Sequence, residues 1–337
     1  MKRFFYLVAL MSTMLAACDK SDQTTTPDEP VPPVTEQPWT PTEGITTESY
    51  YKGEGDTEGV ANCWINFVSD DYVMDDWGDV LSGFVLIVDF NTAVAENPDF
   101  ASLAEGTYVF SENTEAFTVS GATKTACADN RNVETHFVGG SVEVARQGEL
   151  YKIDCLFIAD DGTEEELSYV GDVTFINRSA QGQMSNLKGD VTTGELTQGY
   201  FGLFGESLFE DADSEMAMMV LAGDDFDLEV FYGNSDSICI YFNIPVGANE
   251  IPDGTYTVLS PDSEEIPAGT LVPGLKEGLT IYGTWFFSTE RKLEVSVRGG
   301  SLTVSHEGNI FDIELELLDG YGNKIEGSYH GELEDYS

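Results

Sequence analysis

Apolar and polar residues alternate strictly in residues 311–317, where four apolar residues are separated by three acidic ones. A period of two, with the charges confined to one side, is typical of an antiparallel strand that is buried on one face only. In a helix the same apolar residues would be scattered around the circumference. The segment therefore predicts a β-strand.

The same pattern occurs earlier in the chain, because a shift of 160 positions superposes most of the block 298–333 on the block that begins at Val138 and ends at Phe175. The apolar positions of the two blocks coincide, and four residues are identical at equivalent places. These pairs are Gly140 with Gly300, Gly148 with Gly308, Tyr169 with Tyr329, and Gly171 with Gly331. Each block predicts a meander of three strands.

Glycines indicate where the strands turn and bend. The dipeptides Asp161-Gly162 and Asp319-Gly320 tolerate a positive φ, so each predicts a hairpin turn at the end of the alternating strand. A glycine within the following strand of each block indicates a bulge, a bend or a close backbone approach.

The repeat extends upstream of the meander. Residues 105–109 resemble residues 253–257, and the apolar run 84–90 has a counterpart in residues 237–242. The length of these runs and their β-branched residues favour strands over buried helices. Three nearby methionines are interpreted as filler of the core: Met216, Met218 and Met219.

A repeat of about 150 residues has the size of a domain and is much longer than the period of a solenoid. The sequence therefore predicts an all-β protein with two tandem, homologous antiparallel β-sandwich domains, in residues 49–180 and 195–337. A pair of lipocalin-like β-barrels is the alternative, because consecutive hairpins suit both architectures.

The N-terminus has the order of features found in an export signal. Lys2 and Arg3 precede an apolar run, and small residues lead into Cys18. The tetrapeptide at 15–18, Leu-Ala-Ala-Cys, resembles the lipobox of bacterial lipoproteins. This resemblance implies that residues 1–17 are a signal peptide and that Cys18 is acylated, with palmitate among the attached chains. An ordinary secretory signal with an incidental cysteine is the alternative.

Residues 18–48 predict an extended tether. Six of the 12 prolines of the chain lie between Pro27 and Pro41, with Thr, Asp and Glu among them, so the segment cannot bury apolar area. A lipobox, a tether of this kind and β-domains together resemble the lipoproteins of Bacteroidetes-type bacteria. The resemblance implies an outer-membrane location, and the partly acidic residues 19–22 partly match the signal for export to the cell surface.

The charge balance excludes one class of partner. The chain has 15 basic and 61 acidic residues, and a nucleic-acid phosphate backbone would be repelled by such a surface. The acidic surface keeps an extracellular protein soluble. We predict no cofactor, and calcium is the alternative that the many carboxylates suggest.

Asp211, Asp213 and Glu215 have the alternating spacing that opens an EF-hand loop, and they are the weak calcium candidates. Met216 stands where that loop needs glycine, and Ala222 stands where it needs a bidentate glutamate. The motif therefore fails, and only a loose calcium site remains as a hypothesis.

The sequence predicts no enzymatic activity, because it contains no nucleophile elbow, zinc-binding motif, P-loop or dinucleotide fingerprint. A hydrolase of extracellular polysaccharide is the alternative, since the spacing of two catalytic carboxylates is invisible in a sequence. Cys155 and Cys239 are interpreted as small buried hydrophobic residues, whereas a disulfide between Cys63 and Cys127 is left open.

Tyr72 and Trp77 lie among aspartates, outside any alternating pattern, and are the candidate ligand-binding residues. Aromatic faces on loops stack on sugar rings, and neighbouring carboxylates accept hydrogen bonds from the sugar hydroxyls. The alternative is that Trp77 closes the end of a core. We therefore predict a lipid-anchored, non-enzymatic envelope protein that presents two β-domains for adhesion or for binding a glycan or protein ligand. A structural component associated with fimbriae is a further alternative.

Overall fold

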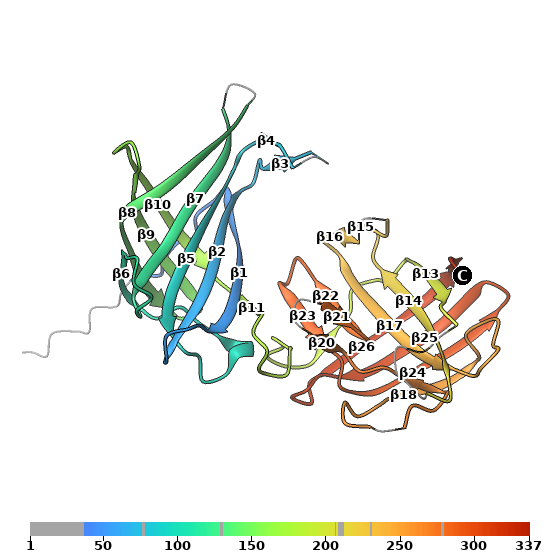
Figure 1. Ribbon diagram of the computed structural model, residues 1–337. Coiled ribbons are helices and arrows are strands. Elements are labelled where there is room, and N and C mark those ends of the chain that lie inside the picture. Colours follow the sequence, from blue (N-terminus) through green and yellow to red (C-terminus); the bar gives the residue numbers. More distant parts are fainter. Residues whose placement is uncertain are drawn as a thin grey trace, which may run out of the picture. The chain divides into compact units, whose positions relative to one another are not determined.

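The computed structural model describes residues 37–75, 78–128, 131–205, 207, 212–229, 231–263, 265–277 and 280–337. The predicted signal peptide, Cys18, most of the tether, Trp77 and Asp211 lie outside these residues. Residues Trp39 to Ser337 form one unit, which holds two large curled sheets (Figure 1). Within the described ranges, the structure contains no helix with the length and apolar character needed to span a bilayer.

The first large sheet has nine strands in the order β10-β9-β8-β6-β7-β5-β2-β1-β11. Its strands are β1 (Ile45–Glu54), β2 (Val60–Ser69), β5 (Phe84–Ala93), β6 (Gly106–Phe110), β7 (Thr118–Ala128), β8 (Arg131–Gln147), β9 (Leu150–Ala159), β10 (Glu164–Asp172) and β11 (Phe175–Asn177). One short 3₁₀ helix, η1 (Pro98–Phe100), lies in the connection between β5 and β6.

The second large sheet has the order β12-β26-β25-β24-β18-β19-β17-β14-β13-β27, and β22 and β23 extend it from β17. Its strands are β12 (Val191–Thr192), β13 (Gln198–Leu203), β14 (Glu215–Ala222), β17 (Asp236–Ile244), β18 (Gly254–Val258), β19 (Thr270–Leu271), β22 (Trp285–Ser288), β23 (Leu293–Ser296), β24 (Gly299–Glu307), β25 (Ile310–Leu318), β26 (Lys324–Glu332) and β27 (Glu334–Asp335). From β26 to β27 the strand order repeats that of the first sheet from β10 to β11, position for position.

Three small hairpins lie beside the large sheets. They are β3 (Val73–Met74) with β4 (Val80–Ser82), β15 (Phe226–Asp227) with β16 (Tyr232–Gly233), and β20 (Leu275–Glu277) with β21 (Thr280–Tyr282).

The glycine pairs of the repeat occupy the same structural positions. Gly140 and Gly300 begin the meanders with φ of 114° and 87°, respectively, which glycine adopts without steric cost. A Cβ atom would lie 1.9 Å from the carbonyl oxygen of Leu156 at the first position, and 2.2 Å from that of Glu316 at the second. The close approach of the neighbouring strand therefore requires glycine in both sheets.

The repeated Tyr-x-Gly pairs have an equally local cause. The hydroxyl groups of Tyr169 and Tyr329 donate to the carbonyl three residues later, at 2.8 and 2.7 Å respectively. Each phenol thus crosses the following glycine, and a Cβ atom would lie 2.2 Å from the phenol oxygen at Gly171 and 2.8 Å at Gly331. Glycine is needed so that the tyrosine can bend back over its own strand.

Equivalent tyrosines also pack within the two cores. Tyr108 packs edge-on against Phe90 at 5.3 Å between ring centroids, and Tyr256 packs edge-on against Phe242 at 4.9 Å. The hydroxyl of each tyrosine donates to the carbonyl four residues earlier, at 2.9 Å for Tyr108 and 2.6 Å for Tyr256. These contacts explain why residues 105–109 resemble residues 253–257.

Each sheet encloses a hydrophobic core of its own, drawn from residues 51–175 in the first sheet and 187–333 in the second. The predicted all-β fold with two sandwich-like parts is confirmed. Each part is one continuous sheet that curls on itself. The residues just before its first long strand therefore lie beside the strand at the opposite edge of the sheet. Thr42 N donates to Val170 O at 2.7 Å in the first part, and Leu196 bridges to Tyr329 in the second.

Two details of the sequence interpretation are wrong. The hairpin turn predicted at Asp319-Gly320 is present, but its residue with positive φ is Gly322 at 86°, the equivalent of Gly162, because Asp319 begins the turn at the place that Ala159 has in the first hairpin. Of the three neighbouring methionines, Met219 belongs to the core cluster and Met216 is also buried, whereas Met218 is only partly buried. Met216 and Met218 alternate with it in β14 and therefore lie on the other face of the sheet.

Candidate functional site

The structure places Tyr72 directly before β3, partly buried, with its hydroxyl 3.4 Å from the sulfur of Met74. Its neighbours Val73 and Met74 are 49% and 55% exposed. Trp77 lies outside the described residues, so the pairing of Tyr72 with Trp77 in one ligand site stays a prediction.

Of the calcium candidates, Asp213 and Glu215 are described and Asp211 is not. Glu215 begins β14, where it pairs with Ile244 of β17. In the part of the chain that the structure describes, no three His, Cys, Asp or Glu residues are grouped so that they could hold a metal ion. Calcium binding through Asp211 therefore stays a prediction.

All four cysteines of the described residues are free thiols, so Cys63 and Cys127 form no disulfide. Cys155 is buried in the first core, as expected. Cys239 lies on the outer side of β17, where burial raises the pKa of its thiol to about 12. Such a thiol stays protonated at neutral pH and is not a nucleophile.

The outer side of the second sheet is apolar across four adjacent strands. We call these residues the aromatic face: Tyr200, Met216, Met218, Val220, Cys239, Tyr241, Trp285 and Phe287 of β13, β14, β17 and β22. Met216, Val220 and Trp285 are buried, and the other five are partly exposed. The strand registers align Tyr200 with Val220, Val220 with Cys239, and Cys239 with Trp285 in one row. The residues that alternate with these belong to the core, so both sides of this part of the sheet are apolar.

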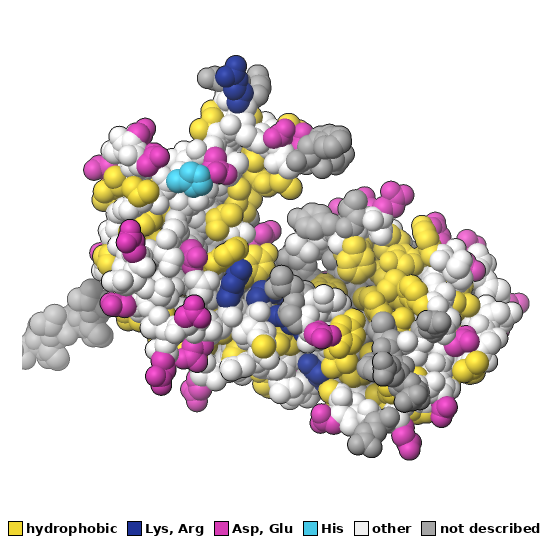
Figure 2. Space-filling view, viewed as in Figure 1, with side chains coloured by type: hydrophobic (Ala, Val, Ile, Leu, Met, Phe, Trp, Pro, Cys, Tyr) yellow, Lys and Arg dark blue, Asp and Glu magenta, His cyan; other side chains and the backbone are white. Residues whose placement is uncertain are grey.

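Exposed aromatic residues lie around the aromatic face. Phe204, Phe231 and Tyr336 are 52%, 43% and 63% exposed, respectively. The ring of Tyr336 lies 5.0 Å from that of Tyr200, and the ring of Phe231 lies 6.5 Å from that of Phe287. Figure 2 shows apolar side chains gathered on the part of the second sheet where Figure 1 labels β14 and β17.

The tyrosines of the aromatic face are poorly hydrated. Burial, followed by the proximity of Cys239 and Tyr200, raises the pKa of Tyr241 to about 12. Burial is also the main cause that raises the pKa of Tyr200, with smaller contributions from Cys239 and Tyr336. At neutral pH the face therefore carries neutral phenol groups and no charge.

The same strands of the first sheet provide an internal comparison. Phe90 pairs with Cys63 and its equivalent Phe242 pairs with Ala217, which fixes the alignment of the two strips. The strand registers then give the equivalent residues on the outer side. They are Glu48 for Tyr200, Trp64 for Met218, Asn66 for Val220, Ile87 for Cys239, and Asp89 for Tyr241.

The outer side of the first strip carries charged and polar residues among apolar ones such as Trp64 and Ile87. The side-chain amide of Asn62 donates to the carboxylate of Asp89, and the ammonium group of Lys52 lies 3.3 Å from the centroid of the Trp64 ring. Desolvation is the main cause that raises the pKa of Asp89, and the Asn62 hydrogen bond opposes it. Backbones with the same pairing thus carry different outer surfaces.

Six of the eight residues of the aromatic face belong to a stretch of sequence without cations. Residues 189–275, which supply β13 to β19, contain 17 Asp and Glu and no Lys, Arg or His. Two acidic side chains lie near Tyr336 at the rim of the face: Glu229, which belongs to this stretch, and Glu334, which does not. Both raise the pKa of Tyr336, mainly through the hydrogen bond that its hydroxyl donates to Glu334 at 3.0 Å. The rim of the aromatic face beside Tyr336 therefore carries negative charge.

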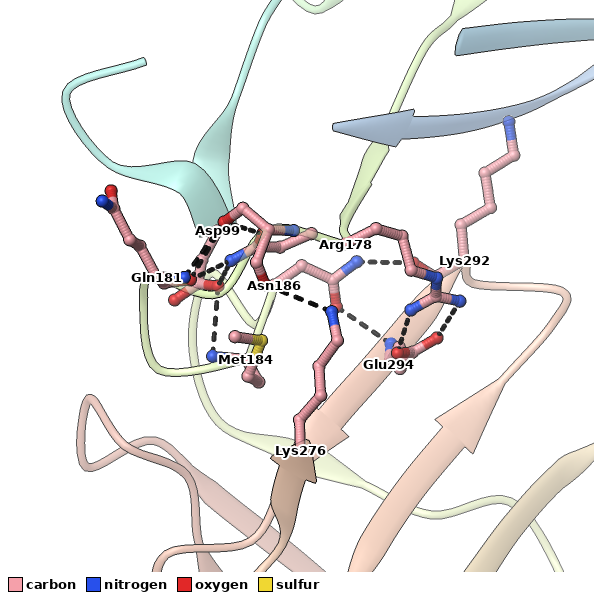
Figure 3. Close-up of polar contacts among 10 residues, drawn as sticks. Asp99, Arg178, Gln181, Met184, Asn186, Lys276, Lys292 and Glu294 are labelled. Atoms are coloured by element: carbon pink, nitrogen blue, oxygen red, sulfur yellow. Dashed lines mark hydrogen bonds and ion pairs between the residues drawn. The ribbon is translucent and has the colours of Figure 1, made fainter. Parts of the chain in front are cut away.

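The segment between the two sheets is held by a second group of polar residues, centred on the buried carboxylate of Asp99 in η1. This carboxylate accepts a hydrogen bond from the backbone N–H of Met184 at 3.1 Å (Figure 3). It also accepts from Asn177 Nδ2 at 2.6 Å and from the hydroxyl of Tyr321 at 2.7 Å. Asp99 thus joins the end of β11, the connecting segment and the β25–β26 turn.

Charged residues hold the same segment on its other side. Arg178 and Glu294 form a bidentate ion pair, with Nη2 and Oε2 2.7 Å apart. Asn186 accepts from the backbone N–H of Glu294 at 3.1 Å and donates to the carbonyl of Lys292 at 2.7 Å. Desolvation is the main cause that lowers the pKa of Lys276 and of Lys292.

A hollow of about 100 Å³ lies beside this junction, with Arg146, Glu149, Tyr151 and Lys188 in its lining. Lys188 is paired with Glu149 at 2.9 Å, and Arg146 lies over the ring of Tyr151 at 4.8 Å. Because both cations already have partners, we interpret the junction as a structural connection and the aromatic face as the candidate functional site.

The chain matches no protein-family model, no curated protein and no solved structure. A functional proposal therefore rests on the geometry and chemistry of the aromatic face.

Proposed function

We propose that the protein is a lipid-anchored, non-enzymatic component of the outer cell envelope, which displays its two β-parts for adhesion or ligand binding. The aromatic face is the binding surface. The observation that carries the proposal is the difference between this face and the more polar outer side of the equivalent strip in the first sheet.

The repeated fold does not require an apolar outer surface. The first sheet has the same strand order and an equivalent core, yet it places Glu48, Asn66 and Asp89 where the second sheet places Tyr200, Val220 and Tyr241. Contiguous apolar surface with a polar rim marks interaction sites on soluble domains. Tyrosine, phenylalanine and methionine are also enriched in protein-binding surfaces.

The side chains of the face favour binding over catalysis. The pKa of the Cys239 thiol and that of the Tyr241 phenol are each raised to about 12, so neither supplies an ionised nucleophile or base at neutral pH. The proposal therefore assigns recognition to these residues and no chemical step.

The N-terminal sequence supports display at a membrane. An acylated Cys18 would hold the protein in the bilayer through its lipid chains, and a proline-rich tether would keep the β-parts away from the headgroups. In cells that produce the protein, Cys18→Ala should move it from the membrane fraction to the soluble fraction.

The binding proposal is tested with the purified full chain on arrays of proteins and polysaccharides. We expect Tyr241→Asp to reduce binding to the recognised ligand by about tenfold or more, because it places a charge in the centre of the face. Ile87→Asp is the matched control, since it adds the same charge to the equivalent side of the first sheet. Equal binding by both variants, with native circular dichroism, would refute the proposal.

A further inference from the structure

Resting on the proposed function, we infer that the aromatic face binds a basic protein surface, in which an apolar centre is surrounded by lysine and arginine. Two independent features of the face lead to this partner: the sign of the charge around it and the chemistry of its centre.

The surrounding charge selects against anionic partners. The chain has a formal net charge of −46, and the 87-residue stretch that supplies most of the face has acidic side chains and no basic ones. Electrostatic complementarity between the rims of two partners speeds association and rejects partners of the same sign. Anionic headgroups and acidic polysaccharides are therefore unfavourable, whereas a basic partner is attracted.

The centre of the face favours a protein over a neutral glycan. On the middle strand of the face Met218 is partly exposed between the buried Met216 and Val220, and these apolar side chains offer neither a hydrogen-bond donor nor a strong acceptor to sugar hydroxyls. Burying sugar hydroxyls against them would leave polar groups unpaired. Protein interfaces, by contrast, combine aromatic residues and methionine in a centre depleted of charge.

A second copy of this chain is a poor occupant of the face. Two copies would each bring a formal charge of −46 to the contact, and like charges across an interface oppose association. The equivalent side of the first sheet carries Glu48 and Asp89, so it does not supply a basic surface either.

The experiment uses the full chain and three defined probes: a hairpin peptide of alternating Leu and Lys, the same peptide with Glu in place of Lys, and a neutral glucose oligomer. Affinities are measured at low and high salt. We expect the Leu/Lys peptide to bind, the other two probes not to bind, and the affinity for the Leu/Lys peptide to fall as salt rises.

Tyr241→Asp separates specific docking from general attraction between opposite charges. The variant adds a negative charge, so non-specific attraction to the Leu/Lys peptide would increase. Docking on the aromatic face would instead weaken by about tenfold or more. Ile87→Asp adds the same charge to the first sheet and should not weaken binding. Should Tyr241→Asp fail to fold, Phe204→Ala tests the same face, because Phe204 is exposed at its edge.

The outcomes distinguish the inference from the proposed function. Binding of the glucose oligomer that is lost in Tyr241→Asp would overturn the basic-protein partner and leave the aromatic face as a binding surface. Equal peptide binding by the wild type, Tyr241→Asp and Ile87→Asp would show mere charge attraction and would overturn the inference. If Tyr241→Asp and Phe204→Ala bound every probe and every array ligand as tightly as the wild type, both the inference and the proposed function would be overturned.

Discussion

The two sheets agree on their inner side and differ on their outer side. Inside, equivalent glycines, tyrosines and apolar residues occupy the same registers. Outside, the strip formed by β1, β2 and β5 contains Glu48, Asn66 and Asp89, while the strip formed by β13, β14 and β17 has Tyr200, Val220 and Tyr241 at the equivalent positions. Packing restricts the inner residues, because cores tolerate little change in volume. The outer residues were free to diverge, so their difference is the more informative guide to function.

The largest expected effect tests whether the two inner sides are as equivalent as they look. Gly300→Ala forces a Cβ atom to within 2.2 Å of a backbone oxygen at a φ of 87°, and should cost about 3–4 kcal/mol in the free energy of unfolding. Gly140→Ala should cost a similar amount. Hydrogen exchange should show lost protection in β24–β26 for the first variant and in β8–β10 for the second.

The turn glycines Gly148 and Gly308 are the matched controls. Their φ values are 64° and 66°, and an added Cβ atom would meet nothing within 4 Å. Alanine at these positions should therefore cost only the backbone strain, about 1–2 kcal/mol. If Gly300→Ala removed protection equally from both sheets, the two parts would unfold as one unit, and a comparison of separate domains would fail.

Much of this inner architecture could be predicted from the sequence, because it depends on local geometry. A tyrosine that bends over the second residue after it requires glycine there, so Tyr169-x-Gly171 and Tyr329-x-Gly331 are visible as a repeat. The alternation in residues 311–317 likewise indicates a strand in a sheet with one solvent-exposed face. Such signals need only neighbours in the chain.

The aromatic face could not be predicted in the same way. β14 has apolar residues on both sides, and a sequence cannot tell whether the second side is covered by the protein or available to a partner. Met216 and Met218 were therefore assigned to the core. Asp99 was missed for another reason: it is a single acidic residue in a loop, and its partners lie 78, 85 and 222 positions away.

The second prediction tests whether the connection couples the two parts. Asp99→Ala removes the buried carboxylate that accepts from Asn177, the Met184 amide and Tyr321, which should cost about 2–3 kcal/mol. Because these contacts join the two parts, the lost stability should separate the unfolding transitions of the two parts more widely in temperature. Calorimetry measures this separation. Asp161→Ala is a control at an exposed turn of the first sheet. A single, unchanged transition in Asp99→Ala would contradict the coupling.

The smallest expected effect appears only at alkaline pH. It concerns two tyrosines at equivalent positions of the two sheets and one tyrosine that only the second sheet has. The pKa values of Tyr108 and Tyr256 are raised to about 12, chiefly by burial, and so is that of Tyr241 on the aromatic face. A phenol whose pKa is higher in the folded state than in the unfolded state stabilises the fold below the unfolded pKa. That contribution is lost as the pH rises from 10 towards 12.

We therefore expect the free energy of unfolding to fall in this range, as followed by urea titrations at successive pH values. Tyr241→Phe should reduce the fall, because phenylalanine cannot ionise in the unfolded chain. Since Tyr241 has Asp89 as its equivalent, no matching phenol exists at that position in the first sheet. An alkaline transition that is identical in Tyr241→Phe and the wild type would mean that Tyr241 is as hydrated as an exposed tyrosine. The outer side of β17 would then not be the dry surface on which the binding proposal depends.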